Sequence, residues 1–342
     1  MEKASMVHDK AFDLEKGRLI ETIKRRGAKR VLIQLPNGLK NYAIDLSNHV
    51  EERTGAVVYI SGGSCYGGCD LALQEAKKLE IDLIIHYGHA PFASTNFYDN
   101  IVYFSAPSKI DPSHLIVKAL NLIEREKKIG LATAVQHLKY LENVKKILDE
   151  NGYDAIIPSK GKFTIYNGQI LGCDYSSLKS IENKVDCCLI IGSHFHGLGA
   201  TLCLNKPVIL VDPYCNEVSD ISYEKNKILK QRYSFIIAAK AAKNIGIIIG
   251  MKIGQHRPEI AQGLRKLVNE SDDRRSTLIC MDEVAPENLN NFTEIDVFIN
   301  TACPRVSVDD AAKFLKPVLT PKEALVALEK LGWEDLIEQG IF

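Results

Sequence analysis

Three cysteines lie just beyond strand-like apolar runs, where their thiols could bind a metal centre. Cys69 lies in the glycine-rich segment after the run 57–60, Cys173 follows the run 155–157 at an expected glycine turn, and Cys303 follows the run 297–300. In an open α/β sheet, ligands bind beyond the C-terminal ends of the strands. Thiolates suit soft centres such as zinc or an iron–sulfur cluster, and three of them leave one iron of a cubane cluster open to substrate. Their spacing matches no zinc-ribbon or ferredoxin pattern, so buried structural cysteines remain the alternative.

Two neighbours of Cys303 support a role in a site. Pro304 cannot donate a ladder hydrogen bond, so the strand before Cys303 must stop there. Arg305 places a permanent positive charge beside the thiol, and that charge would offset the negative charge that a cluster gains on reduction. The two aspartates at 309 and 310 are expected to cap a following helix at 311–315.

The other cysteines have simpler interpretations. Cys65 is either a fourth ligand or a packing residue, and Cys215 is a further candidate at a strand end. The remaining four lie in or beside apolar runs and are expected to be small buried hydrophobic residues: Cys187, Cys188, Cys203 and Cys280.

Three segments could contact a cofactor. The segment 192–199 (GSHFHGLG) resembles a loop whose glycines allow close backbone approach, with Phe195, His196 and Gly197 at its centre; an ordinary strand–helix turn is the alternative. In the segment 250–258, Gln255 and Arg257 could hold a carboxylate, although a solvated loop is equally consistent. Gly38 lies at the matching position of the first domain and could equally belong to a simple turn.

The apolar runs predict an α/β protein of three similar domains, each with a parallel sheet of about four strands flanked by helices. Continuous rather than alternating apolar runs are typical of parallel strands that are covered on both faces. The expected ranges are 1–108 with Cys69, 109–216 with Cys173 and 217–342 with Cys303. The expected strands lie at 31–35, 57–60, 83–86, 101–104, 129–132, 155–157, 188–191, 208–211, 247–249, 277–280, 297–300 and 317–319.

Composition limits the function classes. The chain has 342 residues, of which 46% are hydrophobic, and its 43 Lys and Arg balance its 43 Asp and Glu. This neutrality argues against a direct nucleic-acid-binding surface, which is normally basic. We find neither an N-terminal secretory signal nor an apolar run of membrane-spanning length, so we expect a cytoplasmic protein with no membrane partner and with reduced thiols.

Seven segments together resemble the diphthamide-synthesis family in its archaeal form. They run in order through nearly the whole chain: 34–39 (QLPNGL), 65–70 (CYGGCD), 171–173 (LGC), 195–196 (FH), 211–214 (VDPY), 254–259 (GQHRPE) and 301–305 (TACPR). The resemblance implies an enzyme whose three α/β domains each give one cysteine to a [4Fe-4S] cluster. At the matching positions the ligands are Cys69, Cys173 and Cys303. Gly68, where relatives often carry alanine, is the visible departure.

The resemblance also implies a radical transferase that uses S-adenosylmethionine. Such an enzyme moves the 3-amino-3-carboxypropyl group to the imidazole C2 of a histidine in translation elongation factor 2, releases methylthioadenosine, and thereby begins diphthamide biosynthesis. It would be a homodimer that receives electrons from a separate donor. The segments around Gln255 and Arg257, and around Phe195, His196 and Gly197, are then the candidates for holding S-adenosylmethionine, together with Gly38.

Three alternatives differ in observable ways. A dehydratase resembling quinolinate synthase shares the three-domain, three-cysteine arrangement but would make no methylthioadenosine. A non-catalytic cluster-bearing subunit would be inert alone with dithionite. A zinc-stabilised scaffold would lack the visible absorbance of a cluster.

Overall fold

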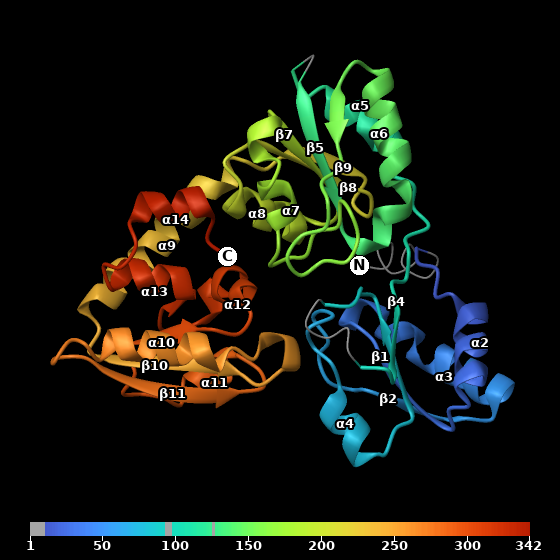
Figure 1. Cartoon of the computed structure of the whole chain (residues 1–342), viewed down its shortest axis with the longest axis horizontal. Coiled ribbons are helices and arrows are strands. Elements are labelled where there is room, and N and C mark those ends of the chain that lie inside the picture. Colours follow the sequence, from blue (N-terminus) through green and yellow to red (C-terminus); the bar gives the residue numbers. More distant parts are fainter. Residues whose placement is uncertain (1–10, 93–97, 125–126) are drawn as a thin grey trace.

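The computed structural model describes residues 11–92, 98–124 and 127–342, and these form three α/β units around a common centre (Figure 1). Each unit contains a sheet of four or five strands, as the sequence predicts. Every expected strand is present, and the observed bounds differ from the expected ones by a few residues at most.

The first sheet has the order β2-β1-β3-β4 and is parallel throughout. Its face with Val31 and Ile33 packs on two helices, and its opposite face with Leu32 packs on a third. The strands are β1 (Arg30–Gln34), β2 (Val57–Ile60), β3 (Leu83–Tyr87) and β4 (Ile101–Phe104). The helices are α2 (Lys16–Arg26), the 3-10 helix η1 (Asn37–Tyr42), α3 (Ala43–Thr54) and α4 (Leu73–Lys78). Gly27 ends α2 in a left-handed conformation (φ 62°), as expected for a glycine stop.

The second sheet has the order β6-β5-β7-β8-β9 and carries a strand that the sequence did not predict. The strands are β5 (Lys128–Thr133), β6 (Asp154–Ile156), β7 (Cys187–Ile191), β8 (Val208–Asp212) and β9 (Glu217–Asp220). The unexpected strand, β9, is antiparallel to β8, so residues 217–220 belong to the second sheet although the sequence assigned them to the third range. The division into 1–108, 109–216 and 217–342 otherwise stays a prediction. The helical segments are α5 (Ser113–Leu120), η3 (Val135–Tyr140), α6 (Leu141–Glu150), α7 (Ser176–Lys179), η4 (Glu182–Lys184) and α8 (His194–Cys203).

The third sheet has the order β11-β10-β12-β13 and is also parallel. Its strands are β10 (Asn244–Gly250), β11 (Arg275–Met281), β12 (Val297–Asn300) and β13 (Val318–Leu319). The helical segments are α9 (Glu224–Ala241), η5 (Ile253–Gln255), α10 (Pro258–Val268), α11 (Pro286–Leu289), α12 (Pro304–Asp309), η6 (Ala311–Lys313), α13 (Pro321–Ala327) and α14 (Trp333–Gln339).

A fully buried ion pair ties the helices of the third unit together. The Arg232 guanidinium on α9 donates to both carboxylate oxygens of Glu323 on α13, at 2.7 and 2.5 Å. It also donates to the backbone carbonyl of Ser307 on α12 at 2.6 Å. Glu323 in turn accepts a hydrogen bond from the backbone of Thr320 and completes a capping box. The pair therefore fixes α12, the helix that follows Cys303.

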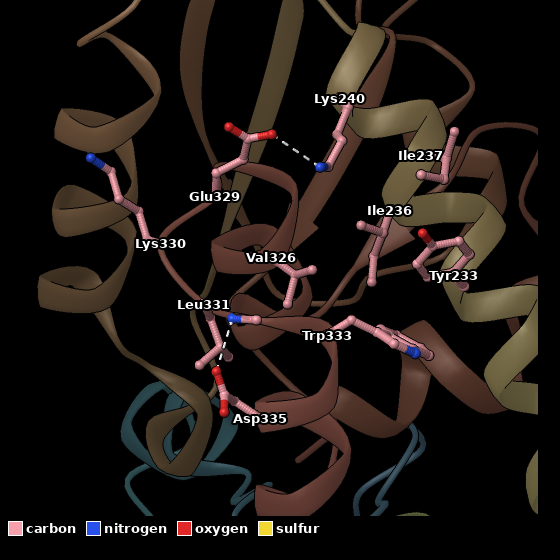
Figure 2. Close-up of a pocket in the computed structure, with 11 residues that line it drawn as sticks. Tyr233, Ile236, Ile237, Lys240, Val326, Glu329, Lys330, Leu331, Trp333 and Asp335 are labelled. Atoms are coloured by element: carbon pink, nitrogen blue, oxygen red, sulfur yellow. Dashed lines mark hydrogen bonds and ion pairs between the residues drawn. The ribbon is translucent and has the colours of Figure 1, made fainter.

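A shallow hollow on the same unit lies between α9 and the α13–α14 segment (Figure 2). Tyr233, Ile237 and Trp333 line it, and Lys240 pairs with Glu329 across it at 3.1 Å. None of the three predicted metal ligands lines this hollow. Among the described residues, no helix is both long and apolar enough to cross a membrane.

Candidate metal centre

The turns after three strands bring Cys69, Cys173 and Cys303 together, one from each sheet. Cys69 follows β2, and its carbonyl accepts a hydrogen bond from the backbone of Gly254 in the third unit at 3.0 Å. Cys173 lies in a turn closed by a bridge between Leu171 and Asp174. Cys303 occupies the N-cap position of α12 without a side-chain capping bond. Pro304 is the first helical residue, and the strand ends before it as expected.

All three thiols line one cavity of about 240 Å³, which we call the cysteine cavity. The residues that share this cavity include Gly67, Gly88, His89, Gln136, Gln169, Phe195, His196, Gln255 and Arg305. The thiols come from segments far apart in the sequence, and the carboxyl ends of parallel strands in all three sheets face the same space. The sequence prediction that these three cysteines share a site agrees with this geometry, while their role as metal ligands stays a proposal.

Burial keeps the three thiols protonated when no cation is bound. It raises the pKa of Cys69 to about 11, against a lowering by a hydrogen bond from Gln255 Nε2 to Cys69 Sγ at 3.5 Å. Burial also raises the pKa of Cys173 and of Cys303, and at Cys173 the charge of Cys303 adds to this effect. A metal centre at this position would displace these protons, because a coordinating thiol is deprotonated outright.

Arg305 lies on the wall of the cysteine cavity with one nitrogen uncommitted. Its Nε and Nη2 donate to Asp309 at 2.7 and 2.9 Å, and Nη2 also donates to the Phe195 carbonyl at 2.9 Å. Its Nη1 is buried and has no hydrogen-bond partner among the described residues. The guanidinium also stacks on the Phe195 ring, 4.0 Å from the centroid. Arg305 therefore joins the third unit to the second beside Cys303.

The expected capping role of the two aspartates is wrong. Asp309 belongs to α12 and pairs with Arg305 four residues earlier, so its carboxylate is not free to cap. Asp310 precedes the 3-10 helix η6 (311–313) but makes no side-chain capping bond, and it pairs with Lys313 at 2.7 Å. An i,i+4 pair within a helix competes with capping for the same carboxylate.

The segment with Phe195, His196 and Gly197 is a helix start rather than a loop. These residues form the first turn of α8, directly after β7. Phe195 and His196 line the cysteine cavity. Gly197 does not line the cysteine cavity. It packs against Ile221 and Leu210, and an ideal Cβ on residue 197 would be 2.4 and 3.2 Å from their side chains. Its small size serves helix–strand packing.

A second cavity of about 270 Å³, which we call the histidine cavity, adjoins the cysteine cavity. Gly38 lines it, together with His137, Ser193 and Tyr214. The two cavities share Gly88, His89, Ala134, Gln136 and His196. Burial lowers the pKa of His196 to about 4, and the positive charge of Arg305 adds to this. The imidazole of His196 is therefore neutral at physiological pH.

Gln255 and Arg257 face different spaces. Gln255 lies in η5 and lines the cysteine cavity, whereas Arg257 lines a larger cleft of about 670 Å³ on the other side of Cys173. We call this the basic cleft, because the charged residues in its wall are mostly cations: Lys162, Lys179, Arg257 and Lys322, with Asp174. The two residues therefore do not form a single carboxylate clamp.

The remaining cysteines divide into two groups. Cys65, Cys187, Cys188 and Cys203 are buried, which confirms the packing interpretation for the last three. Cys280 is exposed, so its prediction as a buried residue is wrong. It lies on β11, an edge strand in which exposed and more buried residues alternate, and its side chain takes the outer face. Cys215 is exposed and does not line the cysteine cavity.

Sequence reasoning missed His89 and Gln136, which line both cavities. His89 follows β3 and Gln136 belongs to η3, so each lies beyond the carboxyl end of a strand. That position is the signal that could have identified them.

Comparison with known proteins identifies the family. A family model for diphthamide synthesis proteins matches residues 35–337. The 2-(3-amino-3-carboxypropyl)histidine synthase of Pyrococcus horikoshii is 33% identical over 318 residues, which are 92% of this chain and 90% of the relative. Subunit 1 of the Schizosaccharomyces pombe synthase is 29% identical over 97% of this chain and 77% of its own length. The crystal structure of Dph2 from Pyrococcus horikoshii with 4Fe-4S cluster has a TM-score of 0.86 and 32% identity, covering 96% of this chain and 95% of that one. The chain therefore belongs to the diphthamide synthesis protein family.

Proposed function

We propose that this chain is a 2-(3-amino-3-carboxypropyl)histidine synthase. It transfers the 3-amino-3-carboxypropyl group of S-adenosylmethionine to the imidazole C2 of a histidine in translation elongation factor 2, the first step of diphthamide biosynthesis. The observation that carries the proposal is the convergence of Cys69, Cys173 and Cys303 on one cavity, in a chain similar to such synthases over nearly its whole length.

The three thiolates would hold a [4Fe-4S] cluster. Soft, partly buried thiols from three separate sheets suit a cluster, and three ligands leave one iron open. The uncommitted Nη1 of Arg305 gives the cavity a buried positive donor that fits an anionic group. When bound, the cluster supplies one electron to the sulfonium of S-adenosylmethionine, and the protein supplies orientation and electrostatics.

The two adjoining cavities suit the two ends of S-adenosylmethionine. We assign the methionyl end to the cysteine cavity, near Gln255 and Arg305, where a guanidinium and an amide can meet its carboxylate. The adenosyl group then occupies the histidine cavity, beside Gly38 and His196. The sulfonium would then lie where the two cavities meet, beside the residues that line both of them. Which carbon–sulfur bond breaks is a matter of orientation at that point.

The reaction balances as a one-electron process. One electron enters the sulfonium, and its bond to the methionine γ-carbon breaks into methylthioadenosine and a carbon radical. The radical adds to C2 of the target imidazole, and the adduct regains its aromatic ring by giving one proton to solvent and returning one electron to the oxidised electron carrier. An external electron donor starts the cycle.

The protein substrate and the partner subunit complete the proposal. The basic cleft, which Arg257 and Cys173 both line, suits an approaching acidic surface of elongation factor 2. We further propose that the chain acts as a homodimer in the cytoplasm.

An anaerobic assay tests the function. Cluster-loaded protein, dithionite, S-adenosylmethionine labelled in the aminocarboxypropyl group, and elongation factor 2 should give label on the target histidine and release methylthioadenosine. Cys69→Ala, Cys173→Ala and Cys303→Ala should each lose the brown chromophore and the activity. Cys187→Ala and Cys280→Ala should retain both. Full iron content in Cys303→Ala protein would contradict the ligand assignment.

The same assay separates the alternatives. Dehydration of a small substrate without methylthioadenosine would indicate a quinolinate-synthase-like enzyme. A cluster-loaded protein that is inert alone with dithionite, but active after addition of a second chain, would indicate a non-catalytic cluster-bearing subunit.

A further inference from the structure

Three other metal-ligating side chains meet inside the first unit: Cys65, His86 and His89. Cys65 Sγ lies 3.9 Å from His86 Nε2 and 4.0 Å from His89 Nδ1, and the two imidazole nitrogens are 2.9 Å apart. One potential ligand atom of each residue thus lies within 4.8 Å of the other two. None of them is one of the three cysteines assigned to the cluster.

The tautomer of His86 is set by Gln34. The amide nitrogen of Gln34 donates to the Asp70 carbonyl at 2.9 Å, and its oxygen accepts from the backbone of Ala72 at 3.2 Å. That orientation presents the Gln34 oxygen to His86 Nδ1 at 3.0 Å, so Nδ1 must carry the proton. His86 Nε2 then carries a lone pair that accepts a hydrogen bond from His89 Nδ1 at 2.9 Å, and a bound ion would take the place of that proton. A ligating histidine that donates its other N–H to an oxygen is the usual outer-shell arrangement of protein metal sites.

The spacing suits a tetrahedral ion. Zinc–sulfur and zinc–nitrogen bonds of usual length place tetrahedral ligand atoms about 3.3 to 3.7 Å apart. The observed separations of 2.9, 3.9 and 4.0 Å scatter around that range, so rotamer shifts of a few tenths of an ångström would centre an ion among the three atoms. Cys65 and His86 are buried, and His89 lines both cavities, which gives an ion a route to the site.

We propose that Cys65, His86 and His89 form a second metal site, which takes one zinc-class divalent ion and leaves a fourth position for water on the His89 side. The ligand set of one thiolate and two imidazoles is borderline soft and suits zinc rather than calcium or magnesium. The site does not share a ligand with the cluster and does not depend on the transferase assignment.

Zinc content and zinc coordination test the site. Cluster-loaded protein receives one equivalent of zinc chloride anaerobically, excess zinc is removed by gel filtration, and iron and zinc are measured per chain. We expect about one zinc per chain without loss of iron, and zinc-edge X-ray absorption with one sulfur and three nitrogen or oxygen neighbours at usual distances, two of these being the imidazoles and one the water. Cys65→Ala and His86→Ala should each lower the zinc affinity by at least about tenfold.

Controls distinguish the site from other thiols. Cys280→Ala removes an exposed thiol of the third unit and should bind zinc as the parent protein does. The absorption spectrum of the parent protein needs no variant, so the test stands even if a core variant folds poorly. No retained zinc, a spectrum with three sulfur neighbours, or equal zinc binding by Cys65→Ala protein would each overturn the proposal.

Discussion

The backbone of Gly254 lies directly against Cys69. Its N–H donates to the Cys69 carbonyl at 3.0 Å, and an ideal Cβ on residue 254 would lie 2.4 Å from the Cys69 Cβ. The two residues belong to different units, the third and the first. The position of one candidate ligand is therefore set by a glycine almost two domains away in the sequence.

Substituting Gly254→Ala should displace Cys69 without removing its thiol. The added methyl group meets backbone as well as the Cys69 side chain, neither of which can rotate away, so the turn must shift. We expect a clear loss of bound iron and of activity in a protein that still folds, measured as iron per chain and visible absorbance. Gly263→Ala is the matched control, because a Cβ there meets nothing within 4 Å. It lies within α10 and should keep its cluster, with a gain of up to about 1 kcal/mol in stability. Normal iron content in Gly254→Ala protein would contradict this account.

Gln255→Leu should make the cluster harder to reduce. The Gln255 amide donates to Cys69 Sγ at 3.5 Å, and a donor to a cluster sulfur stabilises the more negative, reduced state. Removing it should shift the midpoint potential to more negative values while iron content stays unchanged. An anaerobic redox titration followed by electron paramagnetic resonance measures the shift. Gln262→Leu, at an exposed position of α10, should leave the potential unchanged. A potential that is the same in Gln255→Leu and parent protein would exclude the hydrogen bond as a tuning element.

Glu323→Ala should strongly destabilise the third unit. It leaves the Arg232 guanidinium charged and fully buried without its partner, a change that costs about 3 to 5 kcal/mol in other proteins. Urea unfolding should show this loss. The double variant Arg232→Met/Glu323→Leu should recover part of it, because no unpaired charge remains. Equal stabilities of the single and double variants would argue against this explanation.

Acid sensitivity should be reduced by His137→Leu. Both ring nitrogens of this buried histidine lack a partner among the described residues, and burial lowers its pKa to about 4. The unfolded chain binds a proton near pH 6.5, so stability is full above that pH and falls as the pH drops toward 4. The slope from one such histidine is about 1.4 kcal/mol per pH unit.

The midpoint of urea unfolding, measured between pH 7.5 and 5, tests this slope. His137→Leu protein should lose less stability on acidification than the parent protein. His114→Leu, at an exposed position, should follow the parent curve. Parallel curves for all three proteins would show that His137 does not contribute.

The sequence was sufficient for every strand except β9 and for the grouping of the three cysteines. Continuous apolar runs mark strands that are covered on both faces, and each of these cysteines follows such a run. Strand β9 was not predicted because it is short, largely exposed and polar, and therefore has no continuous apolar run. The exposure of the Cys280 side chain could not be predicted either, because the sequence does not distinguish an edge strand from a central one.

Pairings between distant residues could not be predicted from the sequence. The triad of Cys65, His86 and His89 depends on the register of β1 with β3, which places Gln34 beside His86. Arg232 and Glu323 are 91 residues apart and meet only when α9 packs on α13. Such contacts follow from packing rather than from local pattern.

Because each unit contributes one cysteine, the three thiols are together only when all three units have been synthesised and folded. Cys303 is the last of the three to be synthesised, and its position depends on β12, which pairs with β10 and β13. A chain that stops after the second sheet, or whose third unit has not docked, offers two of the three thiols. On the proposed ligand assignment, an unfinished molecule should retain less iron, so the iron content of a preparation would report on the completeness of its assembly.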